Sequence, residues 1–437
     1  MIRAGALLLL VAASAQAARP VLAGEQTYAA PGGQILVHYA TTGTDAVAPA
    51  DADADGTPDF VEATAAAAEQ ALAHYLALGF RRPIADDAID GDPRIDVYLV
   101  DLAQADGHAA TDACTAGRCI GHAVAENDFA GYAYPSLAEA IETVVPHELF
   151  HLVQYAYSDA QPSMWSEGTA VWAVEHLHGD RNGDFERFLP AYLTKTFRPY
   201  ERSTGGFGDA YPYGAALWPH HLGPAIVVDT WTRLETSPLL DALDGALVAA
   251  GSSLDAAWST HTRWNARTGR FALDGDGYDR ARTWAEAPRE APILDRGTAF
   301  VEGLSARYIP LVVDAPALVA VTAPPSIAIA AWLATDDAPL ADGTSLVSDG
   351  TSLLAEVDAG VYTLVLTGLS PRTLATPVDI TLGPIPAPPI DDSGGCRTAP
   401  PSNAVCMIAV LMFGLTRRSA TTFAGRRRTA HGHDARA

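Results

Sequence analysis

The stretch Val145-Pro146-His147-Glu148-Leu149-Phe150-His151-Leu152-Val153 carries the spacing His-Glu-x-x-His inside an apolar, helix-like run. Residues four apart lie on one face of a helix, so His147 and His151 can direct two imidazoles at one metal ion. Glu148 is then placed to accept a proton from water at the open coordination position of a catalytic metal. The stretch therefore predicts a metal-bearing helix around which the rest of the chain is organised.

The expected start of this helix is marked by local sequence signals. Ser136 and Glu139 have the spacing of a capping box, in which each residue satisfies a free backbone N–H of the other. Apolar residues then recur at helical spacing from Leu137 to Leu152, which predicts a buried stripe. Pro146 removes one helix hydrogen bond, and we expect it to kink the helix.

A third metal ligand is expected from a second helix-like run, Trp165-Ser166-Glu167-Gly168-Thr169-Ala170-Val171-Trp172. Glu167 follows His151 by sixteen residues and lies between two tryptophans. Two histidines and one glutamate form a ligand set that suits catalytic zinc, with the fourth position left for water. We therefore predict that His147, His151 and Glu167 bind zinc and that Glu148 is the general base.

The two motifs together resemble those of the gluzincin zinc metallopeptidases, whose second helix carries Asn/Ser-Glu-Gly-x-Ala-x-aromatic. The resemblance covers the region from Asp51 to Glu235, and more narrowly it is to secreted metalloproteases of myxobacteria. It implies a zincin-like domain and an exported zinc metalloendopeptidase that hydrolyses protein or peptide substrates. The metzincin pattern is excluded, because it requires Gly and His where this chain has Gln154 and Tyr157.

The same resemblance implies two further roles. Aminopeptidase-like gluzincins use a tyrosine downstream of the third ligand to stabilise the oxyanion, and Tyr213 is the candidate here, with Tyr211 and His220 as alternatives. Zincins pair an edge strand with the extended substrate, and Gly121–Phe129 is the candidate strand. The alternative function is a non-catalytic, calcium-stabilised surface binding protein on a zincin scaffold.

An acidic loop near the N-terminus has the spacing of an EF-hand calcium loop, with acidic side chains at positions 1, 3, 5, 9 and 12 and glycine at position 6. Pro58 removes the N–H through which paired EF-hands join, so a solitary structural calcium site is expected. It should open a helix from about Phe60 to Leu78. The predicted calcium ligands are Asp51, Asp53, Asp55, Asp59 and Glu62.

Composition restricts the classes of partner. The chain has 437 residues and a formal net charge of -24, which argues against nucleic acid and anionic membranes as partners. An apolar content of 49% predicts a globular protein, and we expect a monomer.

Both ends of the chain carry localisation signals. Residues 1–17 read as a secretory signal peptide that ends in a small-x-small cleavage site, so the protein is expected to be exported. Export permits disulfides, and Cys114 and Cys119 are expected to form one. Near the C-terminus, Cys396, an apolar run and a basic end resemble a myxobacterial sorting segment, which implies attachment to the outer membrane or cell surface.

The fold class expected is α+β, with a zincin-like metalloprotease domain followed by a small all-β sandwich. The sandwich is predicted from short apolar or alternating strands such as Tyr308–Val313, Ile327–Ile329 and Val361–Leu366. The expected division is a zincin-like domain over 18–295, a sandwich over 300–383, a linker over 384–395, a sorting segment over 396–418 and a disordered basic tail over 419–437.

Overall fold

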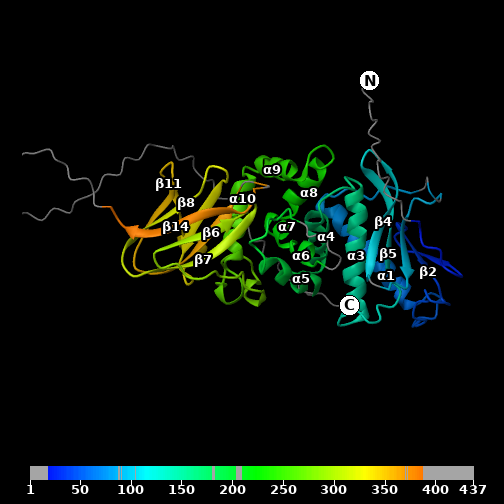
Figure 1. Ribbon diagram of the computed structural model, residues 1–437. Coiled ribbons are helices and arrows are strands. Elements are labelled where there is room, and N and C mark those ends of the chain that lie inside the picture. Colours follow the sequence, from blue (N-terminus) through cyan, green and yellow to red (C-terminus); the bar gives the residue numbers. More distant parts are fainter. Residues whose placement is uncertain are drawn as a thin grey trace, which may run out of the picture. The chain divides into compact units, whose positions relative to one another are not determined.

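The computed structural model describes residues 18–86, 89, 91–103, 105–179, 183–202, 209–369, 371 and 373–386 (Figure 1). The expected signal peptide, sorting segment and basic tail lie outside these residues. The described part is mixed α+β and contains a five-stranded mixed sheet, a four-stranded sheet and a second five-stranded sheet. Among the described helices, none combines the length and the apolar character needed to cross a membrane.

The first sheet has the strand order β1-β2-β3-β5-β4. Strands β2, β3 and β5 run parallel, whereas β1 and β4 pair antiparallel at the two edges. The five strands are β1 (Gln26–Ala29), β2 (Ile35–Tyr39), β3 (Ile95–Val100), β4 (Gly107–Thr115) and β5 (Arg118–Glu126).

The two faces of this sheet follow the period of two along each strand. In β3, Val97 and Leu99 join the large hydrophobic core that also contains residues of α1 (Asp59–Leu78) and α3 (Leu137–Tyr155). Asp96 and Tyr98 lie on the opposite face, where Tyr98 stacks against His38 with ring centroids 4.2 Å apart. One face therefore packs on the helices, and the other carries polar groups.

The substrate-pairing strand predicted at Gly121–Phe129 is wrong. This segment falls largely in β5, whose two edges are already hydrogen-bonded to β3 and β4. The edge strand next to β5 is β4, for which no strand was predicted, and β1 is the edge strand on the opposite side of the sheet. The prediction fails because β4 and β5 form a hairpin, in which β4 takes the edge position and β5 pairs with β3. The disulfide Cys114–Cys119 joins the two strands of this hairpin, as expected.

Helix α3 begins where the capping box places it. The Ser136 hydroxyl accepts a hydrogen bond from the backbone N–H of Glu139 at 3.1 Å. The helix continues through Pro146, whose carbonyl oxygen accepts a hydrogen bond from the Tyr75 hydroxyl at 3.0 Å. Helix α1 thus supports α3 at the turn where the proline removes a donor.

A run of helices follows α3 in the described chain. The helices are α4 (Ser163–His178), α5 (Gly183–Leu193), α6 (Tyr211–Gly214), α7 (Leu217–Leu222), α8 (Pro224–Arg233), α9 (Leu239–Ala249) and α10 (Leu254–Asn265).

The C-terminal part of the described chain forms two antiparallel sheets, ordered β10-β9-β13-β7 and β11-β12-β8-β14-β6. Their apolar residues share one hydrophobic core, which includes Leu311, Leu364 and Val378. The strands are β6 (Arg296–Val301), β7 (Ser305–Val313), β8 (Ala317–Thr322), β9 (Ile329–Ala334), β10 (Thr344–Ser345), β11 (Val347–Ser348), β12 (Leu353–Val357), β13 (Gly360–Gly368) and β14 (Thr376–Pro384).

The strand predicted at Ile327–Ile329 is misplaced, because β9 starts at Ile329. Its pairing partner decides this, since Ile329 is the first residue of β9 in register with β13. The sandwich also contacts α10 closely: the hydroxyls of Thr262 and Thr367 lie 2.7 Å apart, and the Tyr308 hydroxyl donates to the Thr262 carbonyl.

The polar face of the first sheet is closed by the segment directly after the expected signal peptide. The Arg19 guanidinium lies 2.5 Å from both Asp86 and Asp96 and 2.8 Å from Asp112. These carboxylates are almost fully buried, and the arginine side chain itself is 16% exposed. Burial raises the pKa of Asp86 to about 7, against the opposing effect of Arg19. All three acids contact the Arg19 guanidinium, and His38 and His122 lie 2.9 Å from Asp96 and Asp112 respectively.

Replacing this cation should destabilise the fold. Arg19→Ala removes the guanidinium from three buried carboxylates, although Asp96 and Asp112 each keep a histidine neighbour. The free energy of unfolding should fall by about 3–5 kcal/mol. Urea denaturation followed by circular dichroism measures the change. The control is Arg270→Ala, because Arg270 is 73% exposed and pairs at the surface with Glu286, where the expected loss is about 0–1 kcal/mol. Equal losses in the two variants would contradict the prediction.

Candidate metal centre

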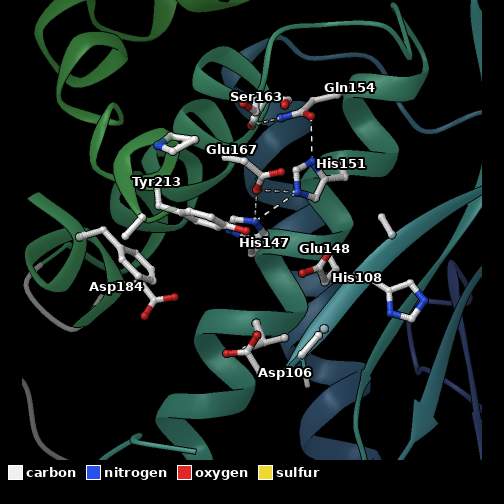
Figure 2. A pocket seen from close by; sticks show the side chains of 18 of the residues that line it. Asp106, His108, His147, Glu148, His151, Gln154, Ser163, Glu167, Asp184 and Tyr213 are labelled. Carbon is white, nitrogen blue, oxygen red and sulfur yellow. Dashed lines mark hydrogen bonds and ion pairs between the residues drawn. The ribbon is translucent and has the colours of Figure 1, made fainter. Parts of the chain in front are cut away.

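Three predicted ligand side chains meet between α3 and α4. His147 Nε2 and His151 Nε2 lie 3.1 Å apart on consecutive turns of α3. The Glu167 carboxylate reaches across from α4 to within 3.3 Å of His147 and 3.4 Å of His151. Figure 2 shows the two ring nitrogens and the carboxylate directed at one another.

These separations fit a metal ion. Ligand atoms around a tetrahedral zinc lie about 3.3–3.4 Å apart when each bond to the metal is about 2.0–2.1 Å long. The three atoms of His147, His151 and Glu167 form a triangle with sides of 3.1, 3.3 and 3.4 Å. The chemistry of the set also fits, because two imidazoles and one carboxylate leave a fourth position open for water or substrate.

The pKa values of His151 and Glu167 show that each side chain stabilises the charged form of the other. Burial lowers the pKa of His151, but the Glu167 carboxylate raises it, and the net value is about 9. The histidines in turn hold the pKa of Glu167 well below its usual range, against the effect of burial. The carboxylate and the imidazoles therefore stabilise positive charge between them, and a metal ion would compete with protons for the histidines.

Glu148 lies on the wall of a cavity of about 950 Å³ that also contains the three ligand side chains. Burial raises the pKa of Glu148, while the two histidines lower it. Strand β4 passes close by: a Cβ on Gly107 would lie 2.9 Å from Cγ of Glu148. Glycine at this position therefore leaves room for the carboxylate beside the free strand edge.

Of the three candidates for an oxyanion donor, Tyr213 is the one that lines the cavity. Its ring stacks on His147, with centroids 6.0 Å apart. Burial and the charges of Glu167 and Glu148 raise its pKa, so the phenol stays protonated and can donate a hydrogen bond at neutral pH. Tyr211 and His220 are not among the residues that line this cavity.

The acidic loop brings together three of its five predicted calcium ligands. Carboxylate oxygens of Asp51, Asp53 and Asp55 lie within 4.8 Å of one another. Asp59 is outside this group, and its carboxylate accepts a hydrogen bond from the backbone N–H of Ala52. Glu62 is also outside the group. Burial and the charges of the aspartates raise the pKa of Glu62. The loop can thus offer part of a calcium site.

Sequence reasoning missed several residues around the centre. Gln154 Oε1 lies 2.9 Å from Nδ1 of His151, and Asp106, Tyr134 and Asp184 line the cavity. Figure 2 labels Gln154, Asp106 and Asp184. The position of Gln154, three residues after His151, was an available signal, since residues three apart share a helix face. The other three come from segments distant in sequence, so no local pattern points to them.

Comparisons with known proteins add little to this geometry. No family model matches the chain, and no curated protein matches it. Among solved structures, the pre-peptidase C-terminal domain of collagenase from Bacillus anthracis is similar over 22% of this chain and 99% of that chain, with 14% identity and a TM-score of 0.19.

The geometry predicts that removal of one ligand abolishes metal binding. His151→Ala and Glu167→Ala should each purify without bound divalent metal, because a three-ligand site cannot lose one strong ligand. Plasma emission spectroscopy on the dialysed proteins measures the metal content. His176→Ala is the control, since His176 lies exposed on the same helix as Glu167. Metal retained by Glu167→Ala would place the third ligand elsewhere.

Proposed function

We propose that this chain is an exported zinc-dependent metalloendopeptidase of the gluzincin type. The observation that carries the proposal is the convergence of His147, His151 and Glu167 beside Glu148 in one cavity. A helix that bears His-Glu-x-x-His, backed by a mixed sheet with an antiparallel edge strand, also supports a zincin-like domain. Export rests on residues 1–17, and surface attachment on residues 396–418.

The ligand set suggests zinc, which when bound supplies Lewis acidity that polarises the scissile carbonyl and lowers the pKa of a water molecule. Glu148 accepts the proton from that water and delivers it to the leaving amine. The Tyr213 hydroxyl donates a hydrogen bond to the carbonyl oxygen as negative charge develops there. Burial, which raises the pKa of Glu148, brings its proton affinity closer to that of a base working near neutral pH.

The free edge of β4 supports a peptide as substrate. Within the described residues, β4 pairs with β5 along one side, and three of its residues, Gly107, His108 and Ala109, line the cavity. Unpaired N–H and C=O groups on a strand edge can bind an extended peptide by strand addition. Backbone hydrogen bonds to β4 would place the scissile bond beside Glu148, and these bonds do not depend on the side chains of the peptide.

The alternative is a calcium-stabilised binding protein on the same scaffold that has no catalytic activity. It shares the acidic loop and the metal centre, but it gives Glu148 no role. A casein zymogram with and without a chelator separates the two functions, since hydrolysis that the chelator abolishes belongs to the enzyme alone.

Glu148→Gln should keep the bound zinc and the fold, because Glu148 transfers a proton and does not bind the metal. The rate of casein hydrolysis should fall by about 10²–10⁴-fold, the contribution typical of a positioned general base. Zinc content and hydrolysis are measured on the same preparation. Wild-type hydrolysis by Glu148→Gln would rule out the proposed mechanism whatever the metal content.

We also propose that the acidic loop binds structural calcium. Replacing both Asp51 and Asp55 with Asn removes two charged ligands, so added calcium should no longer raise the melting temperature. Asp274→Asn is the control, since that side chain is exposed and pairs with Arg282. If added calcium does not change the melting temperature of the wild-type protein, the calcium assignment of the acidic loop is wrong.

A further inference from the structure

Gln154 lies one helical turn beyond His151 on α3 and has 2% of its surface exposed. Both ends of its amide are hydrogen-bonded. Oε1 lies 2.9 Å from Nδ1 of His151, and Nε2 donates to the Ser166 carbonyl at 2.8 Å and to the Thr169 hydroxyl at 3.2 Å. One side chain on α3 thus contacts a predicted metal ligand and the helix that carries the third ligand (Figure 2).

The acceptors on α4 determine which way the amide faces. The Ser166 carbonyl oxygen can accept a hydrogen bond but cannot donate one, so the amide nitrogen of Gln154 must point toward α4. The Thr169 hydroxyl donates to the Trp165 carbonyl at 2.6 Å and therefore presents a lone pair to the same nitrogen. The amide oxygen is left to face His151.

This orientation determines the tautomer of His151. Because Oε1 of Gln154 accepts, Nδ1 of His151 must carry a proton, and Nε2 of the neutral ring keeps the lone pair that binds a metal. Histidines that bind metals usually donate their second N–H to a carboxylate, carbonyl or water. Here the partner is a side-chain amide whose own direction is set by the backbone of α4.

The same contacts set the spacing of the two helices. Ser166 immediately precedes Glu167, so the hydrogen bond from Gln154 to the Ser166 carbonyl holds α4 next to its metal-binding residue. Gln154 and Ser166 both lie between His151 and Glu167 in sequence, so their hydrogen bond joins the two ends of this short connection.

We propose that Gln154 is a positioning residue that orients His151 for metal binding and holds α4 in register with α3. The inference rests on the proposed zinc site. Its two parts use different atoms: the oxygen of Gln154 acts on His151, and the nitrogen acts on α4. They can therefore be separated by substitution.

Three variants separate these parts. Gln154→Leu removes both contacts at similar size. Gln154→Glu keeps an acceptor for His151 but loses both donors to α4. Thr169→Val is the matched control, because it removes one acceptor on α4 and leaves the contact with His151 in place.

The zinc dissociation constant is measured by competition with a chromophoric chelator. The absorption spectrum of the cobalt-substituted protein reports the ligand geometry. The melting temperature of the metal-free protein reports its stability. Gln154→Leu should bind zinc about 10–100-fold more weakly, the range typical for loss of such a partner, with an altered cobalt spectrum. Gln154→Glu should recover most of that affinity and yet melt lower than wild type. Thr169→Val should melt lower with unchanged affinity and spectrum.

Gln154→Leu with wild-type zinc affinity would overturn the inference while the zinc site stands. Gln154→Glu with affinity as weak as that of Gln154→Leu would also overturn it, since packing between the helices would then explain both losses. Gln154→Glu keeps a polar side chain, and its affinity relative to wild type decides the question even if Gln154→Leu does not fold. A loss of about 10–100-fold in Gln154→Glu would then overturn the inference. A wild-type protein that binds no zinc would overturn the proposed function as well.

Discussion

The separation of helices α3 and α4 is the constraint on which the candidate centre depends. Two imidazoles and a carboxylate meet there at 3.1–3.4 Å, and bringing such groups out of water is costly unless they have a partner. The ion pairs of Glu167 in the described structure are with histidines. A metal ion or a retained proton must therefore supply the positive charge that holds the group together.

Packing on both sides keeps the helices at this distance. Phe150 on α3 contacts Tyr75 and Phe80, each with ring centroids 5.0 Å apart, so α3 cannot move away from α1. On the far side of α4 from α3, a Cβ added to Gly168 would lie 3.3 Å from the backbone of Ala216. Helix α4 therefore packs directly on the segment that follows Tyr213 in the sequence. Small residues at such contacts let backbone approach backbone.

Two buried charge clusters in this protein are neutralised in different ways. On the polar face of the first sheet, Arg19 supplies a permanent cation to Asp86, Asp96 and Asp112. His38 and His122 also contact two of these acids, whereas at the candidate metal centre the ion pairs of Glu167 are with imidazoles, whose charge depends on protonation. A guanidinium does not exchange for a metal ion, whereas a protonated imidazole does by releasing its proton. The first cluster therefore suits a structural role and the second a metal-dependent one.

The local sequence by itself determined the helices, the capping of α3 by Ser136 and the presence of His147 and His151 on one helix face, because these follow from interactions between residues three or four apart. Apolar patterns also predicted parts of some strands of the C-terminal sheets, such as β7 and β13. Tertiary structure alone decided that β4 is the edge strand beside the cavity, that Tyr213 lines the cavity, and that Gln154 also donates hydrogen bonds to α4. Each of these depends on which segments meet after folding, and pairing between distant segments leaves no periodic signal in the chain.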